Sequence, residues 1–196
     1  MSVNRIQLLR ITICGAQMYP IIRMTWQMWK HRNDRKLAFH EMHVSHHYCL
    51  PWDLDIFWEL NNGRTLTLYD LGRIPLGYRI GLQAALRRRR WGLTVAGSSP
   101  RYRKRIRAFE RIEMRSRGIG WDDRFIYVEQ SMWKRDGTCA GHVLIRSAIT
   151  GKDGVVAPIE LVRELGQSTE RLPLPDWVTN WVNADATRPW PPMQQN

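Results

Sequence analysis

A short polar segment before a long apolar run holds the residues best suited to chemistry. It reads Asp53-Leu-Asp55-Ile-Phe-Trp-Glu-Leu-Asn61-Asn62. A carboxylate such as Asp55 can attack an acyl carbon as a nucleophile or serve as the general base for water. Free N–H groups at a helix N-terminus, with the helix dipole behind them, can stabilise the oxyanion that develops. If a helix begins at Asn62, the intervening loop can bring Asp55 back to that helix end.

The same residue types also cap helices and close loops, so the segment has a purely structural explanation as well. We expect Asn61 to serve as a cap. For Asp55 we favour catalysis, because one helix cap does not need four such polar residues. Glu59 can orient water, pair with Arg64 or face solvent, and a second carboxylate beside Asp55 would raise the pKa of one of the two.

Apolar spacing predicts the elements that position this segment. Residues 40–50 alternate as a strand does, and residues 62–74 are apolar around most of a helix, which predicts a buried helix. We place a break at Pro75 and Gly77 and a second helix up to Arg90. The residues that share one face of the first strand are Met42, Val44, Tyr48 and Leu50.

Four strands are expected between residues 92 and 150, followed by two short helices. The turn signals between the strands are Ser99-Pro100, Trp121-Asp122-Asp123 and Asp136-Gly137, and the helices lie near Pro158–Leu165 and Pro175–Val182. The order predicts an α+β fold in which a curled antiparallel sheet wraps around a central apolar helix. We divide the chain into a lead-in and amphipathic helix (1–36), the main domain (37–166), and a C-terminal helix with a disordered tail (167–196).

The polar segment, with NNGRTLTLYDLGR and the later GWDDRFIYVEQ, resembles the signature of the 4-hydroxybenzoyl-CoA thioesterase-like branch of the hotdog superfamily. The resemblance covers about residues 40–150 and implies a hotdog fold that hydrolyses acyl-CoA to free acid and CoA. It implies that Asp55 is the catalytic carboxylate and that the N–H at Asn62 polarises the thioester carbonyl. Further residues that we place at the site are Glu59 in catalysis and Asn61, Gly63 and Arg64 beside the substrate.

The sequence departs from this family at Trp58-Glu59, where many members carry Gly-His. The substitution leaves the detailed mechanism open. It also leaves open an alternative function, that of a non-catalytic acyl- or lipid-binding hotdog protein at a membrane surface.

Two arginine clusters are candidates for the phosphates of CoA, which arginine can hold by paired hydrogen bonds. One is Arg87–Arg90, at the end of the second predicted helix, where cations are favourable in any case. The other contains Arg103, Arg105 and Arg107, whose alternation would put them on one face of a strand. The sequence does not rank the clusters, and we assign Arg103 and Arg105 to the substrate.

The composition narrows the remaining function classes. Thirty Lys and Arg against eighteen Asp and Glu give a formal charge of +12, which attracts anions, but no nucleic-acid-binding motif is present and we expect no such partner. Four histidines between His40 and His47 lack acidic or cysteine partners at ligand spacing, so we expect no metal. We also expect no cofactor, because the sequence contains no dinucleotide fingerprint and no P-loop.

Residues 18–32 predict a helix with Ile22, Trp26 and Trp29 on an apolar stripe. We favour packing of this helix on its own domain, and keep peripheral membrane contact as the alternative because tryptophans and cations are combined. No uncharged apolar run is long enough to span a bilayer, and the three cysteines form no framework. We therefore expect a cytoplasmic protein, with peripheral association with a membrane as the alternative.

The predicted sheet has an open edge, and an unpaired strand invites pairing with a second copy. We expect a homodimer or a homotetramer, since two-fold assemblies are the commonest. The resemblance implies the same, because hotdog thioesterases usually build the acyl pocket between two protomers.

Overall fold

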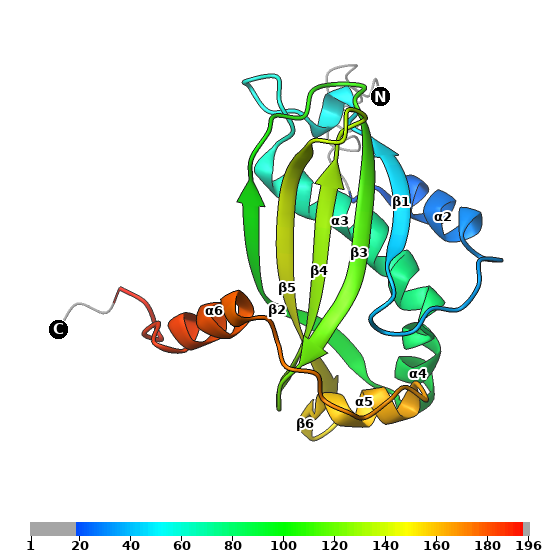
Figure 1. Cartoon of the computed structure of the whole chain (residues 1–196), viewed down its shortest axis with the longest axis vertical. Helices are drawn as coiled ribbons and strands as arrows, with labels where there is room; N and C mark the ends of the chain where they lie inside the picture. Colours follow the sequence, from blue (N-terminus) through cyan, green and yellow to red (C-terminus); the bar gives the residue numbers. More distant parts are fainter. Residues whose placement is uncertain (1–18, 194–196) are drawn as a thin grey trace, which may run out of the picture.

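The computed structural model describes residues 19–193 (Figure 1), so the predicted lead-in 1–17 and Cys14 lie outside it. Its helices are α2 (Ile21–Lys30), α3 (Asn62–Arg79), α4 (Leu82–Arg89), α5 (Pro158–Glu164) and α6 (Asp176–Ala186), with the 3-10 turn η1 (Pro51–Asp53). Its strands are β1 (His43–Tyr48), β2 (Gly92–Tyr102), β3 (Arg111–Trp121), β4 (Phe125–Trp133), β5 (Cys139–Gly151) and β6 (Gly154–Val156).

The sheet runs in the order β1-β3-β4-β5-β2, every pairing is antiparallel, and β6 adds to the end of β5. Figure 1 shows α3 crossing behind this curled sheet from β2 toward β1. The α+β hotdog architecture predicted from the sequence is therefore confirmed. Within residues 19–193 no helix is both long and apolar enough to cross a membrane.

The main core lies between α3 and the sheet. Leu68, Tyr69 and Leu71 of α3 are fully buried against strand residues such as Met114. The helix comes close to β3 at Gly72, where a Cβ would lie 2.5 Å from the sulfur of Met114. A small residue is needed there, and the predicted burial of this helix is confirmed.

The break predicted at Pro75 and Gly77 is wrong. Pro75 lies inside α3, which continues to Arg79, and the chain turns at Gly81 with φ 85°. Proline within a helix costs a backbone hydrogen bond. Here Pro75 and Leu76 are buried, so tertiary packing outweighs that local cost.

The turn predicted at Ser99-Pro100 is also wrong, because β2 runs through it to Tyr102. Proline is tolerated since, among residues 19–193, β2 is the last strand of the sheet and pairs on one side only, with β5. The turn comes later, over residues 103–110. Arg103, Arg105 and Arg107 therefore lie in a loop, and their predicted place on one strand face is wrong.

Strand β1 is confirmed, but its inner face is polar. His43, Ser45 and His47 are buried, while Val44 and Tyr48 are exposed. The buried groups find partners: Ser45 Oγ lies 2.8 Å from His47 Nε2, and Arg79 lies 2.9 Å from Nδ1 of His43. Burial lowers the pKa of both His43 and His47 to about 3.

Helix α2 is confirmed, but it does not pack through its apolar stripe. Ile22, Trp26 and Trp29 are 87%, 57% and 53% exposed. The helix is held through its polar side instead, where Gln27 is buried and Arg23 pairs with Asp53 at 2.7 Å. The expected packing of this helix on its own domain is confirmed, with Met24 against the main core, but the predicted apolar stripe faces outward.

Both predicted C-terminal helices are present. Helix α6 is longer than predicted and packs Val178 against Tyr127 and Leu144 of the sheet. Figure 1 shows it extending outward beyond β2, on the side of the sheet away from α3.

Candidate active site

The N-terminus of α3 is built as predicted. Asn61 caps the helix, since its Oδ1 accepts hydrogen bonds from the N–H groups of Gly63 (2.9 Å) and Arg64 (3.2 Å). Asn62 is the first helical residue, and its N–H donates to no acceptor within residues 19–193. The cap thus satisfies two helix-end donors and leaves the Asn62 N–H available to a ligand.

A cavity of about 230 Å³ opens beside this helix end. Helix α3 contributes Asn62 and Thr65, and the preceding loop contributes Glu59. The opposite wall comes from the end of β2 and the loop that follows it. The residues on that wall are Tyr102, Arg103, Lys104, Arg105 and Ile106.

Glu59 is the acidic residue that lines this cavity. Its Oε2 lies 2.8 Å from Nε of Arg105, and the Glu59 side chain is 28% exposed. The loop that carries Arg105 is fixed to the neighbouring strand β5, because the N–H groups of Arg103 and Lys104 both donate to the carbonyl of Ala140 (2.9 and 3.0 Å). A carboxylate, a helix N-terminus and a cationic loop therefore meet at one opening.

Asp55 lies in the same loop but does not line the cavity. Its Oδ1 accepts a hydrogen bond from the N–H of Phe57 (2.8 Å), and its own N–H donates to the carbonyl of Glu59 (2.9 Å). These bonds close a tight turn with Trp58 at φ 58°. In this arrangement Asp55 fixes the turn from which Glu59 projects.

Asp53 and Arg64 form a buried ion pair behind the loop. Asp53 is fully buried, and its two oxygens lie 2.7 Å from Arg23 and 3.0 Å from Arg64. Arg64 is thus directed at Asp53 rather than the cavity. Sequence reasoning missed this pair, because it considered Glu59 as the partner for Arg64, whereas Glu59 pairs with Arg105.

A second polar group lies farther along α3. Arg73 pairs with Asp70 and also donates to Gln130 of β4 (3.2 Å). Burial raises the pKa of Asp70, although Arg73 opposes the shift. Beyond Arg73 a cavity of about 50 Å³ lies between α3 and the sheet. Its lining is mainly apolar and includes Leu76, Leu93, Val128 and Leu161.

The two arginine clusters lie at opposite ends of the molecule. Arg103 and Arg105 border the cavity, whereas α4 and its C-terminal arginines lie beside α5 at the far end of the sheet (Figure 1). Arg88 pairs there with Glu164 at 2.8 Å. The geometry therefore favours the loop cluster as the group that can reach a ligand in the cavity.

The comparison with known families places the chain in one of them. Residues 49–182 match the family model described as the thioesterase-like superfamily, so the chain belongs to that superfamily. The match begins just before the polar segment and ends within α6.

Two curated relatives are both called Protein THEM6. The Xenopus laevis protein is 30% identical over 135 residues, which are 68% of this chain and 63% of that protein. The Drosophila melanogaster protein is 30% identical over 138 residues, 69% of each. The chain thus spans less than two thirds of the length of the Xenopus relative.

Among solved structures, a hypothetical protein from Staphylococcus aureus determined in complex with CoA superposes with a TM-score of 0.58. The alignment covers 73% of this chain and 95% of that one at 10% sequence identity. At this level of identity the likeness shows the shared fold.

Proposed function

We propose that this protein hydrolyses acyl-CoA thioesters at the cavity beside α3. The observation that carries the proposal is that Glu59, the free N–H of Asn62 and the Arg103–Arg105 loop all border the same opening. Membership of the thioesterase-like superfamily supports the reaction class. The finer placement in the 4-hydroxybenzoyl-CoA thioesterase-like branch is part of the proposal and rests on the resemblance of the polar segment, NNGRTLTLYDLGR and GWDDRFIYVEQ.

In the proposed reaction the thioester carbonyl oxygen accepts a hydrogen bond from the N–H of Asn62. The positive end of the α3 dipole then stabilises the oxyanion as it forms. Water attacks the carbonyl carbon and gives its proton to a carboxylate, and the C–S bond breaks to release CoA thiolate and the acid. Glu59 is the carboxylate favoured for this step, because it lines the cavity and Asp55 does not.

Arg105 has two roles in this scheme. Without substrate it pairs with Glu59 and holds that carboxylate at the opening. The phosphates of CoA compete for the same guanidinium, since arginine binds phosphate by charged hydrogen bonds. Substrate binding then releases Glu59 for catalysis at the moment when the base is needed.

The expected homodimer fits this site. Strand β2 is an edge strand with Leu93 and Val95 exposed (40% and 49%), and its end forms one wall of the cavity. A second copy paired along β2 would extend the sheet and border both cavities. Assembly and activity are linked in this proposal.

The test is release of free thiol from a panel of acyl-CoAs by purified protein, with Glu59→Gln and Asp55→Asn beside the wild type. Turnover that depends on Glu59 supports the proposal. If no acyl-CoA is turned over, although acyl-CoA binds and Arg105→Gln weakens that binding, the alternative of a non-catalytic acyl-binding protein replaces it.

A further inference from the structure

Three loops meet at one end of the molecule, which we call the loop end. They are residues 54–60, residues 103–110 and the turn at residues 134–138, and Figure 1 shows them together above the sheet. The contacts that join them to each other and to the residue after β1 are Leu60 N–H to Ile106 O (2.8 Å), Lys134 Nζ to Arg105 O (3.0 Å) and Phe109 N–H to Cys49 O (2.6 Å).

Large apolar side chains cover this end. Ile56, Phe57 and Trp58 follow one another at the tip of the first loop and are 84%, 72% and 78% exposed. Trp52 and Phe109 flank them and are 52% and 69% exposed. We call these five residues the apolar tip. Contiguous exposed apolar surface of this kind usually marks an interaction site.

The backbone also holds two of these aromatic residues in an unusual conformation. Trp58 has φ 58° and Phe109 has φ 62°, in the left-handed region that side chains other than glycine rarely adopt. Such a conformation costs about 1 kcal/mol or more and tends to persist at functional sites. Burial within residues 19–193 does not offset this cost for either side chain, because both are exposed to solvent.

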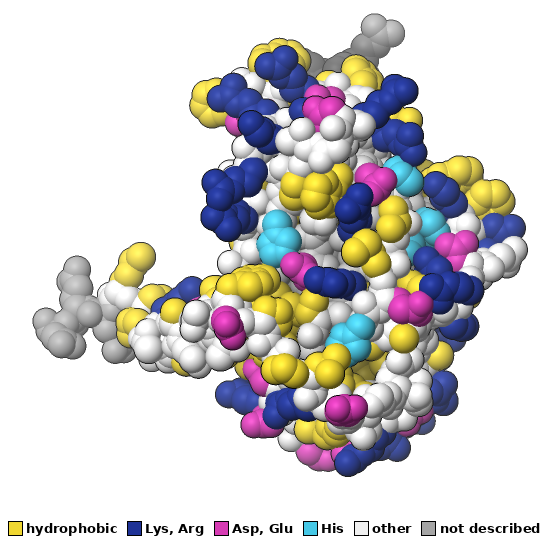
Figure 2. All heavy atoms as spheres, viewed as in Figure 1, with side chains coloured by type: hydrophobic (Ala, Val, Ile, Leu, Met, Phe, Trp, Pro, Cys, Tyr) yellow, Lys and Arg dark blue, Asp and Glu magenta, His cyan; other side chains and the backbone are white. Residues whose placement is uncertain are grey.

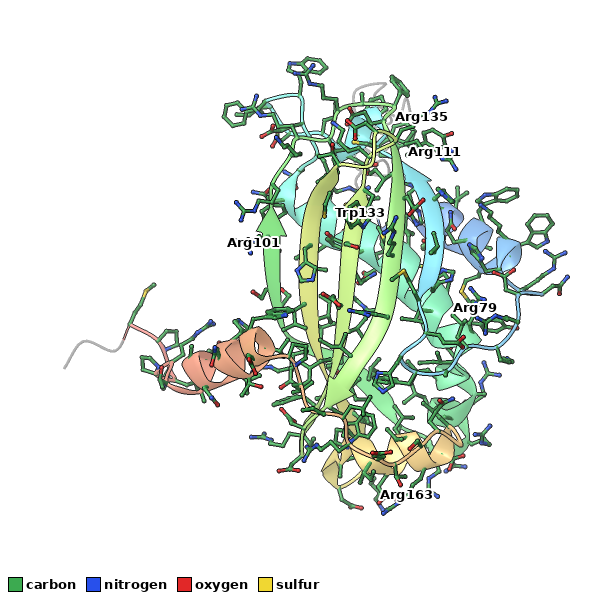
Figure 3. All side chains as sticks on the ribbon, viewed as in Figure 1. Arg79, Arg101, Arg111, Trp133, Arg135 and Arg163 are labelled. Atoms are coloured by element: carbon green, nitrogen blue, oxygen red, sulfur yellow. The ribbon has the colours of Figure 1, made fainter. Side chains whose placement is uncertain are left out.

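Exposed cations lie on the same loops and at the strand ends beside them, and we call these residues the basic collar. Its members are Arg103, Lys104, Arg105, Arg107, Arg111 and Arg135. Figure 2 shows basic side chains interspersed with apolar ones at this end, and Figure 3 places Arg111 and Arg135 there. Only Arg105 of the collar forms an ion pair within the part of the chain that the structure describes.

We propose that the loop end docks on an anionic phospholipid bilayer, with the apolar tip in the headgroup region and the basic collar against the lipid phosphates. Aromatic and aliphatic side chains combined with cations are the pattern by which proteins bind membrane interfaces. An anionic leaflet attracts each basic residue held near its surface. The positive charge of the basic collar therefore matches an anionic bilayer. The apolar tip argues against a partner that binds through charge alone.

The docking surface and the cavity share Arg103, Lys104 and Arg105. A docked molecule would therefore hold its cavity mouth at the bilayer surface. If the proposed hydrolysis is correct, the favoured substrates are acyl-CoAs whose chains partition into membranes. The docking itself is measured without turnover, so it can fail or succeed independently of that reaction.

The experiment is co-sedimentation of the full chain with phosphatidylcholine vesicles, with and without phosphatidylserine. The tip variant is Ile56→Ser/Phe57→Ser/Trp58→Asn, in which asparagine suits the positive φ. Its control is Trp190→Ser/Met193→Ser, which removes residues that are 86% and 97% exposed elsewhere on the surface. The collar variant is Arg107→Glu/Arg135→Glu, and its control is Arg87→Glu/Lys152→Glu, with the same change of charge.

Wild type should bind the serine-containing vesicles more tightly. The tip variant should lose at least about tenfold in affinity, since burial of one large apolar side chain alone is worth that much. The collar variant should lose at least about 25-fold on anionic vesicles, at about fivefold for each charge removed. Both controls should bind as wild type does.

Other results overturn the proposal. Wild-type binding by the tip or collar variant would do so, as would equal binding to vesicles with and without phosphatidylserine. Loss of binding in Trp26→Ser/Trp29→Ser, with the tip variant unaffected, would assign the contact to α2. A tip variant that changes the mass of the assembly in solution but not vesicle binding would make the tip a contact between copies.

Discussion

Glu59 and Arg105 form an ion pair of 2.8 Å across the mouth of the cavity at the N-terminus of α3. One residue comes from the loop before the helix and the other from the loop after β2. The pair joins the acidic group proposed for catalysis to the cationic loop proposed to hold CoA. A change on either side should therefore affect both binding and turnover.

Arg103 and Arg105 should contribute to recognition of the nucleotide end of CoA. Arg103→Gln and Arg105→Gln are each expected to raise KM for an acyl-CoA more than for the matching acyl-pantetheine, which lacks the nucleotide phosphates. Steady-state kinetics on the two substrates measures the difference. Arg87→Gln, at the far end of the molecule, is the control and should leave both KM values unchanged. Equal effects on the two substrates would remove the loop from the CoA site.

The buried carboxylate of Asp53 should hold α2 and α3 together. Asp53→Asn leaves Arg23 and Arg64 without their counter-charge, and breaking a buried pair in this way costs about 3–5 kcal/mol. Urea unfolding gives the change in free energy. Glu160→Gln breaks the exposed Glu160–Arg163 pair and should cost less than about 1 kcal/mol. Similar losses in both variants would contradict this account.

The polar face of β1 should make stability depend on pH. The pKa of His43 and of His47 is lowered to about 3 by burial, so below pH 6.5 the unfolded chain binds protons that the native protein does not. Stability is therefore expected to fall as the pH drops from 7 to 5. The slope approaches about 1.4 kcal/mol per pH unit for each histidine. Urea unfolding at several pH values tests this, and His47→Gln should reduce the slope. A flat profile would show that these imidazoles are not buried in solution.

Strand β2 should carry the contact between two copies. Leu93→Lys/Val95→Lys puts charges on that edge and should convert a dimer into a chain of 23.2 kDa with little residual turnover. Light scattering coupled to size exclusion measures the mass. Val44→Lys on β1, the other edge of the sheet, is the matched control and should stay dimeric. A fully active wild-type species of 23.2 kDa would refute both the assembly and the shared pocket.

Local chemistry allowed the sequence to predict the start of α3. Asn61 was expected to cap it and does, because capping depends on a few neighbouring residues. The Asp136-Gly137 turn, where Gly137 has φ 82°, followed from the same kind of local rule. The alternation of β1, the apolar spacing of α3 and the four runs between residues 92 and 150 together indicated the order of elements.

Features that depend on distant neighbours were not predictable. A proline such as Pro100 interrupts a strand when that strand has neighbours on both sides, because proline has no N–H to donate. The sequence does not show that β2 lies at the edge of the sheet. His43 faces the interior beside Arg79, which is 36 residues away in the sequence and lies on α3. The site has the same limit, since only the folded loop shows that Glu59 rather than Asp55 lines the cavity.

The most direct test of the central claim compares turnover by Glu59→Gln and Asp55→Asn on the best acyl-CoA substrate. Both changes remove a charge with little change of shape, and thermal unfolding checks that each variant is folded. Loss of the general base should lower kcat of Glu59→Gln by about 10²–10⁴-fold, with a smaller loss for Asp55→Asn, whose turn stays in place. Near wild-type kcat in Glu59→Gln, together with a large loss in Asp55→Asn, would contradict the account and return the catalytic role to Asp55.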